Sequence, residues 1–216
     1  DQMEQLKIDI YEKKIAEQEL YLQCSRLQIN PHFFLNSLNT LYLLNKRREH
    51  AQMDQILTYL LDYFRNIFSG KRDIVRLGDE VNLVLSYAAV QKFRYDGNIH
   101  IKYEVEKEAE EVPVPSMVML TFVENSIKYG FCEIYEGGQI RIHVYKQDGR
   151  LILTVYNSGI PIAEEMAEKI NALNGRPLSE ARKLFPKNAK NGYGVSNVLT
   201  RLRLKYGEEV LFTYRA

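Results

Sequence analysis

A histidine inside an apolar helical pattern is the first residue in the sequence with the chemistry of a nucleophile. His32 directly follows Pro31. Three asparagines share this segment although their neighbours are bulky and apolar: Asn30, Asn36 and Asn39. A neutral imidazole is a competent nucleophile near neutral pH. A lone helical histidine is more often structural, so His32 becomes a candidate only in combination with other motifs.

A second candidate site combines an acid, an amide and an amine on one predicted helix. Glu124 and Lys128 are four residues apart, and Asn125 and Lys128 are three apart. These spacings place the three side chains on neighbouring parts of one helix surface. The amide oxygen of Asn125 is a suitable ligand for Mg²⁺, which otherwise keeps waters and substrate phosphates. By itself, the spacing also fits an exposed salt bridge.

Two glycine-containing turns complete the set of candidates. Asn157 stands at the end of a predicted strand, two residues before Gly159. The segment Gly192-Tyr193-Gly194 opens a predicted helix that contains Asn197, and the N–H groups of a helix start attract anions. It is not a P-loop, since no Gly-Lys-Ser/Thr follows, and it lacks the third glycine and the preceding strand of a Rossmann fingerprint. Each turn alone is weak evidence.

The residues before position 70 predict helices. Residues 1–68 read as helix throughout, and heptad spacing over residues 1–27 favours a coiled coil, with one amphipathic helix as the alternative. The polar stretch 45–52 divides the following apolar segment into two helices, which predicts an antiparallel hairpin. Its faces are too apolar for a lone hairpin in water, so we expect dimerisation into a four-helix bundle.

After Ser69-Gly70 the pattern changes to that of an α+β fold. The predicted elements are helices over 79–95, about 116–129 and 194–206, and strands over 99–105, 139–145, 151–156 and 210–214. We therefore predict an α+β protein, with a helical module followed by an α+β domain. Its predicted domains are a helical module at 1–70, a hinge linker at 71–78 and a second domain at 79–216.

Composition excludes several classes of protein. The 216 residues include 29 basic and 28 acidic ones, for a net charge of +1, which argues against a nucleic-acid binder. No apolar run approaches the ~20 residues of a membrane span. Two cysteines cannot form a disulfide framework and favour a reducing compartment. The chain begins at Asp1, so we expect it to be part of a longer protein.

The order of these motifs resembles the sensor histidine kinases of the LytS/YesM type. Residues 28–39 are similar to the histidine motif of that family, and residues 122–130 to its N-box. Residues 192–202 are similar to its last glycine box, with Val195 in place of leucine. The resemblance extends over about residues 20–207. It implies a Bergerat-type ATP-binding sandwich for residues 79–216, with one mixed sheet covered by helices.

The resemblance also implies a role for each motif. His32 would accept the phosphoryl group, and Asn125 would hold Mg²⁺ against the phosphates of ATP. Glu124 and Lys128 would assist at the phosphates or at the metal-bound water. Asn157 aligns with the residue that contacts the adenine amino group. The remaining residues expected to bind the nucleotide are Gly159, Gly192, Gly194 and Asn197, and residues 163–191 would form the ATP lid.

The chain departs from the family pattern in three places. Where the family often has Asp-x-Gly-x-Gly, this chain has Asn157, Gly159 and Pro161; the amide oxygen of Asn157 accepts the adenine hydrogen bond without a charge. Tyr129 replaces a common histidine. The chain ends at Ala216, so we expect the last strand of the family sheet to be absent.

Two functional hypotheses follow from these observations. The first is the cytoplasmic kinase part of a bacterial two-component sensor, with a membrane sensor region upstream. As a homodimer, it would phosphorylate His32 from Mg-ATP and pass the phosphoryl group to an aspartate of a response-regulator receiver domain. The alternative is a non-catalytic dimeric signalling module with a degenerate nucleotide site. Another ATPase with the same sandwich fold would have no use for the His32 motif.

Overall fold

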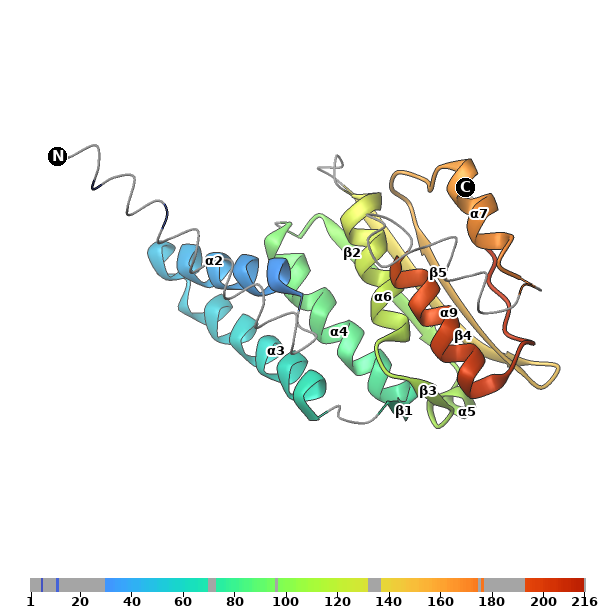
Figure 1. Ribbon diagram of the computed structural model, residues 1–216. Coiled ribbons are helices and arrows are strands. Elements are labelled where there is room, and N and C mark those ends of the chain that lie inside the picture. The colour runs from blue at the N-terminus through green and yellow to red at the C-terminus, as the bar shows by residue number, and fades with distance from the viewer. Residues whose placement is uncertain are drawn as a thin grey trace. The chain divides into compact units, whose positions relative to one another are not determined.

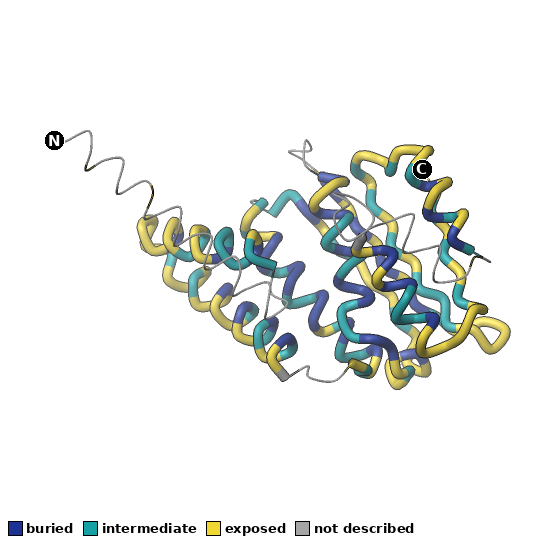
Figure 2. The backbone as a smooth tube through the Cα atoms, in the orientation of Figure 1, coloured by how far each residue is buried: buried dark blue, intermediate teal, exposed yellow. Residues whose placement is uncertain are grey.

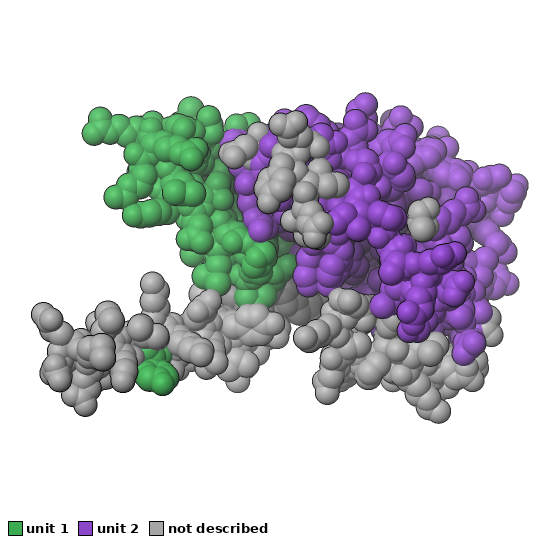
Figure 3. Space-filling model, turned by 90° about the horizontal axis from the view of Figure 1, so that it is seen from above, with its two compact units in different colours: residues 1–69 green, residues 70–216 purple. Residues whose placement is uncertain are grey.

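The computed structural model describes Gln5, Tyr11 and residues 30–69, 73–95, 97–131, 137–174, 176 and 193–215. The chain divides into two compact units, residues 1–69 and 70–216, which Figure 3 shows in different colours. The first unit is helical and the second combines helices with strands. This confirms the predicted α+β class.

Two helices form a hairpin in the first unit. Helix α2 (Pro31–Arg47) packs against α3 (His50–Ser69). Arg48 between them is left-handed, with φ 60°, and its N–H donates to the carbonyl of Asn45 at 3.0 Å. This geometry ends α2 sharply and reverses the chain. The predicted hairpin is confirmed, and the rings of Phe33 and Tyr63 meet inside it at a centroid distance of 4.6 Å.

The expectation of uninterrupted helix over residues 1–68 is wrong at Asn30. This residue has extended backbone angles (φ −68°, ψ 108°), and its Oδ1 accepts a hydrogen bond from the N–H of Phe33 at 3.2 Å. Pro31 occupies the first helical position, where its missing N–H costs nothing. A new helix therefore starts at the histidine motif. Gln5 and Tyr11 are helical, and the rest of the heptad segment lies outside the described residues.

A mixed sheet of three strands forms the second unit's framework. Its strands are β2 (Ile99–Val105), β4 (Gly138–Gln147) and β5 (Arg150–Asn157), in the order β2-β4-β5. Strand β2 is parallel to β4, and β4 is antiparallel to β5. Asp148 and Gly149 have φ 51° and 73° and form the two-residue turn of the predicted hairpin. The mixed sheet and the three strands predicted here are confirmed.

Helices cover one face of this sheet. The main ones are α4 (Leu77–Arg94), α6 (Val118–Asn125) and α9 (Tyr193–Tyr206), which lie side by side in Figure 1. Buried residues line all three (Figure 2). Their apolar side chains meet Ile140, Ile142 and Val144, which alternate along β4 with exposed polar residues. Short α5 (Lys107–Glu110) and α7 (Glu164–Asn171) complete the unit.

Part of the segment expected to be a linker belongs to the second unit. Strand β1 (Ile74–Arg76) pairs antiparallel with β3 (Pro113–Pro115), and α4 begins at Leu77. The sequence pattern did not reveal β3 because two of its three residues are proline, which is tolerated in an edge strand but usually argues against one. Residues 70–72 lie outside the described part of the chain.

The prediction of a final strand over residues 210–214 is wrong. These residues join no strand ladder among those described. Instead, the side chain of Asn171 donates to the carbonyl of Tyr214 at 2.9 Å and accepts from its N–H at 2.7 Å. Asn174 makes the same pair of hydrogen bonds with Phe212. The side-chain amides of Asn171 and Asn174 thus satisfy the backbone groups that a neighbouring strand would otherwise bond.

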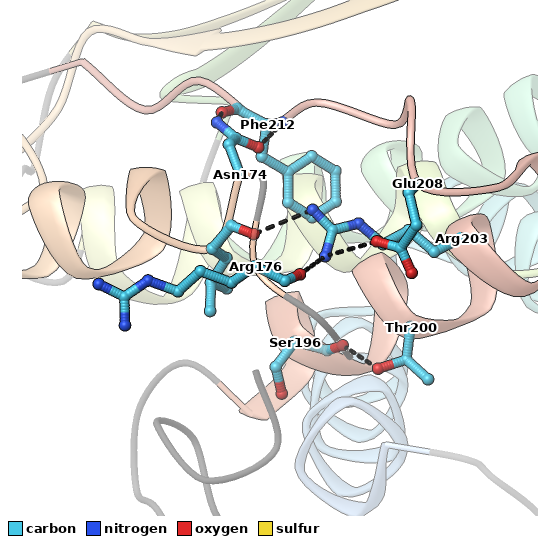
Figure 4. Close-up of polar contacts among 8 residues, drawn as sticks. Asn174, Arg176, Ser196, Thr200, Arg203, Glu208 and Phe212 are labelled. Atoms are coloured by element: carbon cyan, nitrogen blue, oxygen red, sulfur yellow. Dashed lines mark hydrogen bonds and ion pairs between the residues drawn. The ribbon is translucent and has the colours of Figure 1, made fainter. Parts of the chain in front are cut away.

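A buried arginine joins α9 to the chain that follows α7 (Figure 4). Arg203 is only 3% exposed. Its Nη1 donates to the carbonyl of Arg176 at 2.7 Å, and its Nη2 donates to the carbonyl of Leu173 at 2.9 Å. Nη1 also lies 3.4 Å from a carboxylate oxygen of Glu208. The guanidinium therefore satisfies two carbonyls that follow α7, within the segment expected to be the ATP lid.

Replacing Arg203 by methionine removes these donors while keeping much of the apolar stem. We expect Arg203→Met to lower the free energy of unfolding by about 2–4 kcal/mol, because two carbonyls lose charge-assisted hydrogen bonds. Urea titration followed by circular dichroism measures the change. Lys205→Met on the same helix is the control, since Lys205 is exposed and its replacement should cost under about 0.5 kcal/mol. Equal losses would contradict the assigned role of Arg203.

Candidate active site

His32 lies in the first turn of α2 and is exposed. The side-chain nitrogen of Asn36, one turn later, lies 3.1 Å from Nε2 and 3.2 Å from Nδ1 of the imidazole. An amide N–H can donate to whichever ring nitrogen is unprotonated, so Asn36 is placed to orient the imidazole. The sequence shows Asn36 as a polar neighbour but does not predict this contact.

The N-box lies at the end of α6 and in the π-helix that follows it, η1 (Ser126–Gly130). Glu124 and Asn125 are half-buried, and Lys128 is exposed with its Nζ 4.8 Å from the ring centroid of Tyr129. A π-helix bonds residue i to i+5 and has a wider turn. The prediction of regular α-helix up to Tyr129 is therefore wrong after Asn125, and the three-residue and four-residue spacings to Lys128 do not define one α-helical surface.

Two polar residues on α4, Tyr87 and Gln91, form a pair that interacts with Glu124 through Tyr87. Tyr87 and Gln91 are both buried, and their side chains share a hydrogen bond. Burial, together with the negative charge of Glu124, raises the pKa of the Tyr87 hydroxyl above its usual range. This hydroxyl therefore stays protonated at neutral pH. Arg94 extends the group, with its Nη1 3.5 Å from Oε1 of Gln91.

The turn after β5 packs against the last residue of the N-box. The carbonyl of Gly130 accepts a hydrogen bond from the N–H of Ile160 at 2.8 Å. A Cβ on Gly130 would lie 2.7 Å from Nδ2 of Asn157, and a Cβ on Gly159 would lie 2.0 Å from the carbonyl oxygen of Gly130. Glycine is therefore required at position 159, and a side chain at position 130 would displace that of Asn157. The contact brings Asn157 and Gly159 to the end of the N-box.

The start of α9 contacts the other part of the N-box helix. A Cβ on Gly194 would lie 3.3 Å from Cγ2 of Thr121 on α6. Asn197 is exposed on α9, and Gly192 lies outside the described residues. Three motifs that are far apart in the sequence thus meet around α6 and η1. Thr121 was not predicted as a contact, because the N-box pattern alone does not show which residue faces the glycine box.

The oxygen donors here fit a cation that is held mainly by a nucleotide. Among the described residues, no group of three or more His, Cys, Asp or Glu side chains could hold a metal ion. Asn125 and Glu124 supply one amide and one carboxylate at adjacent positions. Mg²⁺ commonly takes one or two protein oxygens, with phosphates and waters completing its octahedron. The donor set therefore fits Mg²⁺ bound together with a triphosphate.

Comparison with known proteins gives consistent matches. The sequence model of the family described as "Histidine kinase" matches residues 20–99. Sensor histidine kinase YesM of Bacillus subtilis is 26% identical over 91% of this chain, and sensor protein LytS of Enterococcus faecalis is 26% identical over 98% of it. Sensor histidine kinase BtsS of Escherichia coli is 26% identical over 84%. The chain is therefore similar to sensor histidine kinases of the LytS/YesM type, and its residues 20–99 match the histidine kinase family.

The chain spans about a third of the length of these relatives, with 31% of YesM, 34% of LytS and 28% of BtsS matched. A solved structure of histidine kinase ThkA in complex with response regulator protein TrrA matches with 20% identity and a TM-score of 0.36. The match covers 85% of this chain and 56% of ThkA. Each helix in the described part of the chain is too short or too polar to span a membrane.

Proposed function

We propose that the chain is the kinase part of a two-component sensor: it transfers the γ-phosphoryl group of Mg-ATP to His32 and then to an aspartate of a response-regulator receiver domain. The main support for this proposal is that the N-box, the Asn157 turn and the start of α9 contact one another around α6 and η1. The exposed imidazole of His32 in the first unit supplies an acceptor. Similarity to sensor histidine kinases of the LytS/YesM type supports the same reaction.

The nucleotide would bind along the second unit's N-box. Asn157 would accept from the adenine amino group, with Gly159 allowing the close turn beside it. Backbone N–H groups at the start of α9 would face the phosphates, because a helix start favours anions. We place Gly192, Gly194 and Asn197 there. Asn125 would hold Mg²⁺, which neutralises phosphate charge when bound, and Glu124 and Lys128 would assist at the phosphates.

In the transfer step, an imidazole nitrogen of His32 attacks the γ-phosphorus. A nitrogen–phosphorus bond forms, the bond from the γ-phosphorus to the bridging oxygen breaks, and ADP leaves with that oxygen. The other ring nitrogen gives up its proton to solvent. The product places a dianionic group in the first turn of α2, where the positive end of the helix dipole stabilises negative charge.

The first unit also carries an apolar surface that supports the proposed homodimer. Large apolar side chains on α2 and α3 are exposed: Leu38, Tyr42, Leu43, Leu57, Leu61 and Phe68. Contiguous apolar surface of this kind commonly marks an interface. Two hairpins packed into a four-helix bundle would cover it. Residues 70–72 connect the units and would serve as the hinge of the predicted linker.

Specific residues favour the alternative of a non-catalytic signalling module. Asn157 provides a neutral acceptor for adenine, Pro161 replaces a glycine, and Lys128 lies over the ring of Tyr129. Each change weakens one expected contact with ATP. The two functions are separated by the affinity of the chain for Mg-ATP.

Titration of the full chain with Mg-ATP in a calorimeter tests the nucleotide site. We expect binding in the micromolar range for the unmodified chain, and Asn125→Ala should raise the Kd about tenfold or more through loss of an oxygen ligand. Asn82→Ala is the control, because Asn82 is an exposed asparagine on α4. No binding at millimolar nucleotide would overturn the kinase proposal and favour the signalling module.

A further inference from the structure

A buried carboxylate on α4 reaches the start of the N-box helix. Glu80 is 2% exposed. Its Oε1 accepts a hydrogen bond from the N–H of Met117 at 2.5 Å, and its Oε2 accepts from the N–H of Met119 at 3.1 Å. Met117 is the N-cap residue of α6 and has no capping side chain of its own. Glu80 therefore provides, from another helix, the acceptors that a helix start leaves unfilled.

An arginine of the glycine box acts at the same place. Nη1 of Arg201 on α9 donates to the carbonyl of Ser116 at 2.7 Å, and its Nη2 donates to Oγ of Ser116 at 3.0 Å. The positive charge of Arg201 also favours the ionised form of Glu80. Three helices are therefore joined at residues 116–119: α4 through Glu80, α9 through Arg201, and α6 through its own first N–H groups.

Packing alone does not explain an acid at this position. Apolar residues fill the neighbouring buried positions of α4, including Leu77, Leu83 and Val84. A buried carboxylate is costly unless hydrogen bonds and a positive charge compensate for its lost hydration. Burial raises the pKa of Glu80 to about 7, against the opposing effects of the backbone donors and Arg201. An apolar side chain would avoid this cost but could not orient the N–H groups of α6.

We propose that Glu80 is a positioning residue of the nucleotide site, which together with Arg201 sets the direction of α6 and so places Glu124 and Asn125 at its far end. Helix α6 has only eight residues and moves as a rigid body, so a tilt at its start also moves its last residues. The inference deepens the proposed function and rests on it for its effect on ATP. The holding of α6 by Glu80 is testable without nucleotide.

The test compares Glu80→Gln with the unmodified full chain by two measurements. Glutamine keeps the shape but places an NH₂ group opposite one backbone N–H donor, so one acceptor is lost. We expect amide hydrogen exchange at Met119 and over the rest of α6 to accelerate about tenfold without nucleotide. We also expect the Kd for Mg-ATP, measured by calorimetry, to rise about tenfold.

Two control variants separate positioning from general loosening. Asp79→Asn removes the same charge from the preceding residue, whose side chain is 46% exposed and 3.5 Å from Arg76; it should change neither measurement. Leu83→Ala removes buried apolar volume from α4 without touching Glu80's hydrogen bonds. We expect Leu83→Ala to lower the thermal midpoint but to leave the Kd for Mg-ATP, measured where the chain is folded, within about twofold.

The outcomes of the two proposals are distinguishable. If the unmodified chain binds no Mg-ATP, the proposed function fails, while the exchange measurement still decides whether Glu80 holds α6. Unchanged exchange in α6 of Glu80→Gln overturns the positioning role, as does an equal rise in Kd for Leu83→Ala. If Glu80→Gln does not fold, Glu80→Asp is measured in its place, because a shortened carboxylate must weaken the same hydrogen bonds. Amide hydrogen exchange in α6 of Glu80→Asp that is no faster than in Leu83→Ala would then overturn the proposal.

Discussion

The change His32→Gln is expected to reduce phosphoryl labelling of the chain to background. The unmodified chain, incubated with Mg²⁺ and γ-labelled ATP, should acquire label that is lost in acid and retained in base, as expected of a phosphorylated imidazole. Glutamine keeps a polar group at the exposed second position of α2 but has no nucleophilic nitrogen. Because His32 is exposed, the free energy of unfolding should change by under about 0.5 kcal/mol.

A second histidine of the same unit provides the control for this result. His50 is exposed at the start of α3, and His50→Gln should leave the label unchanged. Asn125→Ala should reduce the label strongly, because it weakens the binding of Mg-ATP. Label that persists in His32→Gln, or that is lost in His50→Gln, would show that His32 is not the acceptor.

Replacing Gly159 by alanine should remove ATP binding through a single methyl group. The added Cβ would lie 2.0 Å from the carbonyl oxygen and 2.6 Å from the carbonyl carbon of Gly130. Both atoms belong to backbone, so the turn after β5 must move away from η1, and with it Asn157. We expect the free energy of unfolding to fall by about 2–4 kcal/mol and Mg-ATP binding to be lost.

Gly78→Ala is the matched control for this steric prediction. A Cβ at Gly78 would meet its nearest atom at 3.5 Å, which is an ordinary contact. Gly78 lies in the first turn of α4, where alanine is the better helix former, so the variant should be neutral or up to about 1 kcal/mol more stable. Urea titration and calorimetry measure both variants. Retained ATP binding in Gly159→Ala would refute the close contact with Gly130.

The sequence predicts best those elements that have a strong apolar period. Helix α4 and strand β4 bury one face, and β2 and β5 are less exposed on one face than on the other, so their period shows directly in the order of residues. The turn at Asp148 and Gly149 is readable because it needs residues that tolerate positive φ. Strands β1 and β3 were missed because three residues are too few to show an alternation. The chain at 210–214 alternates like a strand, but its partners are the amides of Asn171 and Asn174.

For the candidate site, the motifs identified the segments but not the contacts between them. The meeting of Gly159 with Gly130, and of Gly194 with Thr121, depends on tertiary packing that no spacing within one segment specifies. The role of Asn36 depends on a helix that restarts at Pro31. Glu80 could have been noticed in the sequence, since it is an acidic residue among the mostly apolar buried positions of α4. The resemblance of residues 192–202 included Arg201 without revealing that it binds Ser116.

The π-helix η1 also constrains the number of residues in its own segment of the chain. Each residue of an α-helix turns the backbone by about 100°, so deletion of one residue from Ser126–Gly130 would favour regular α-helical bonding and rotate Gly130 away from the turn that contains Asn157. The deletion would improve local backbone geometry and dismantle the contact between two motifs. An exposed side chain without an assigned role in this segment, such as Tyr129, can be exchanged during evolution, whereas an insertion or deletion here should be selected against. Among related genes, we therefore expect the segment equivalent to η1 to vary in residue type but not in the number of residues.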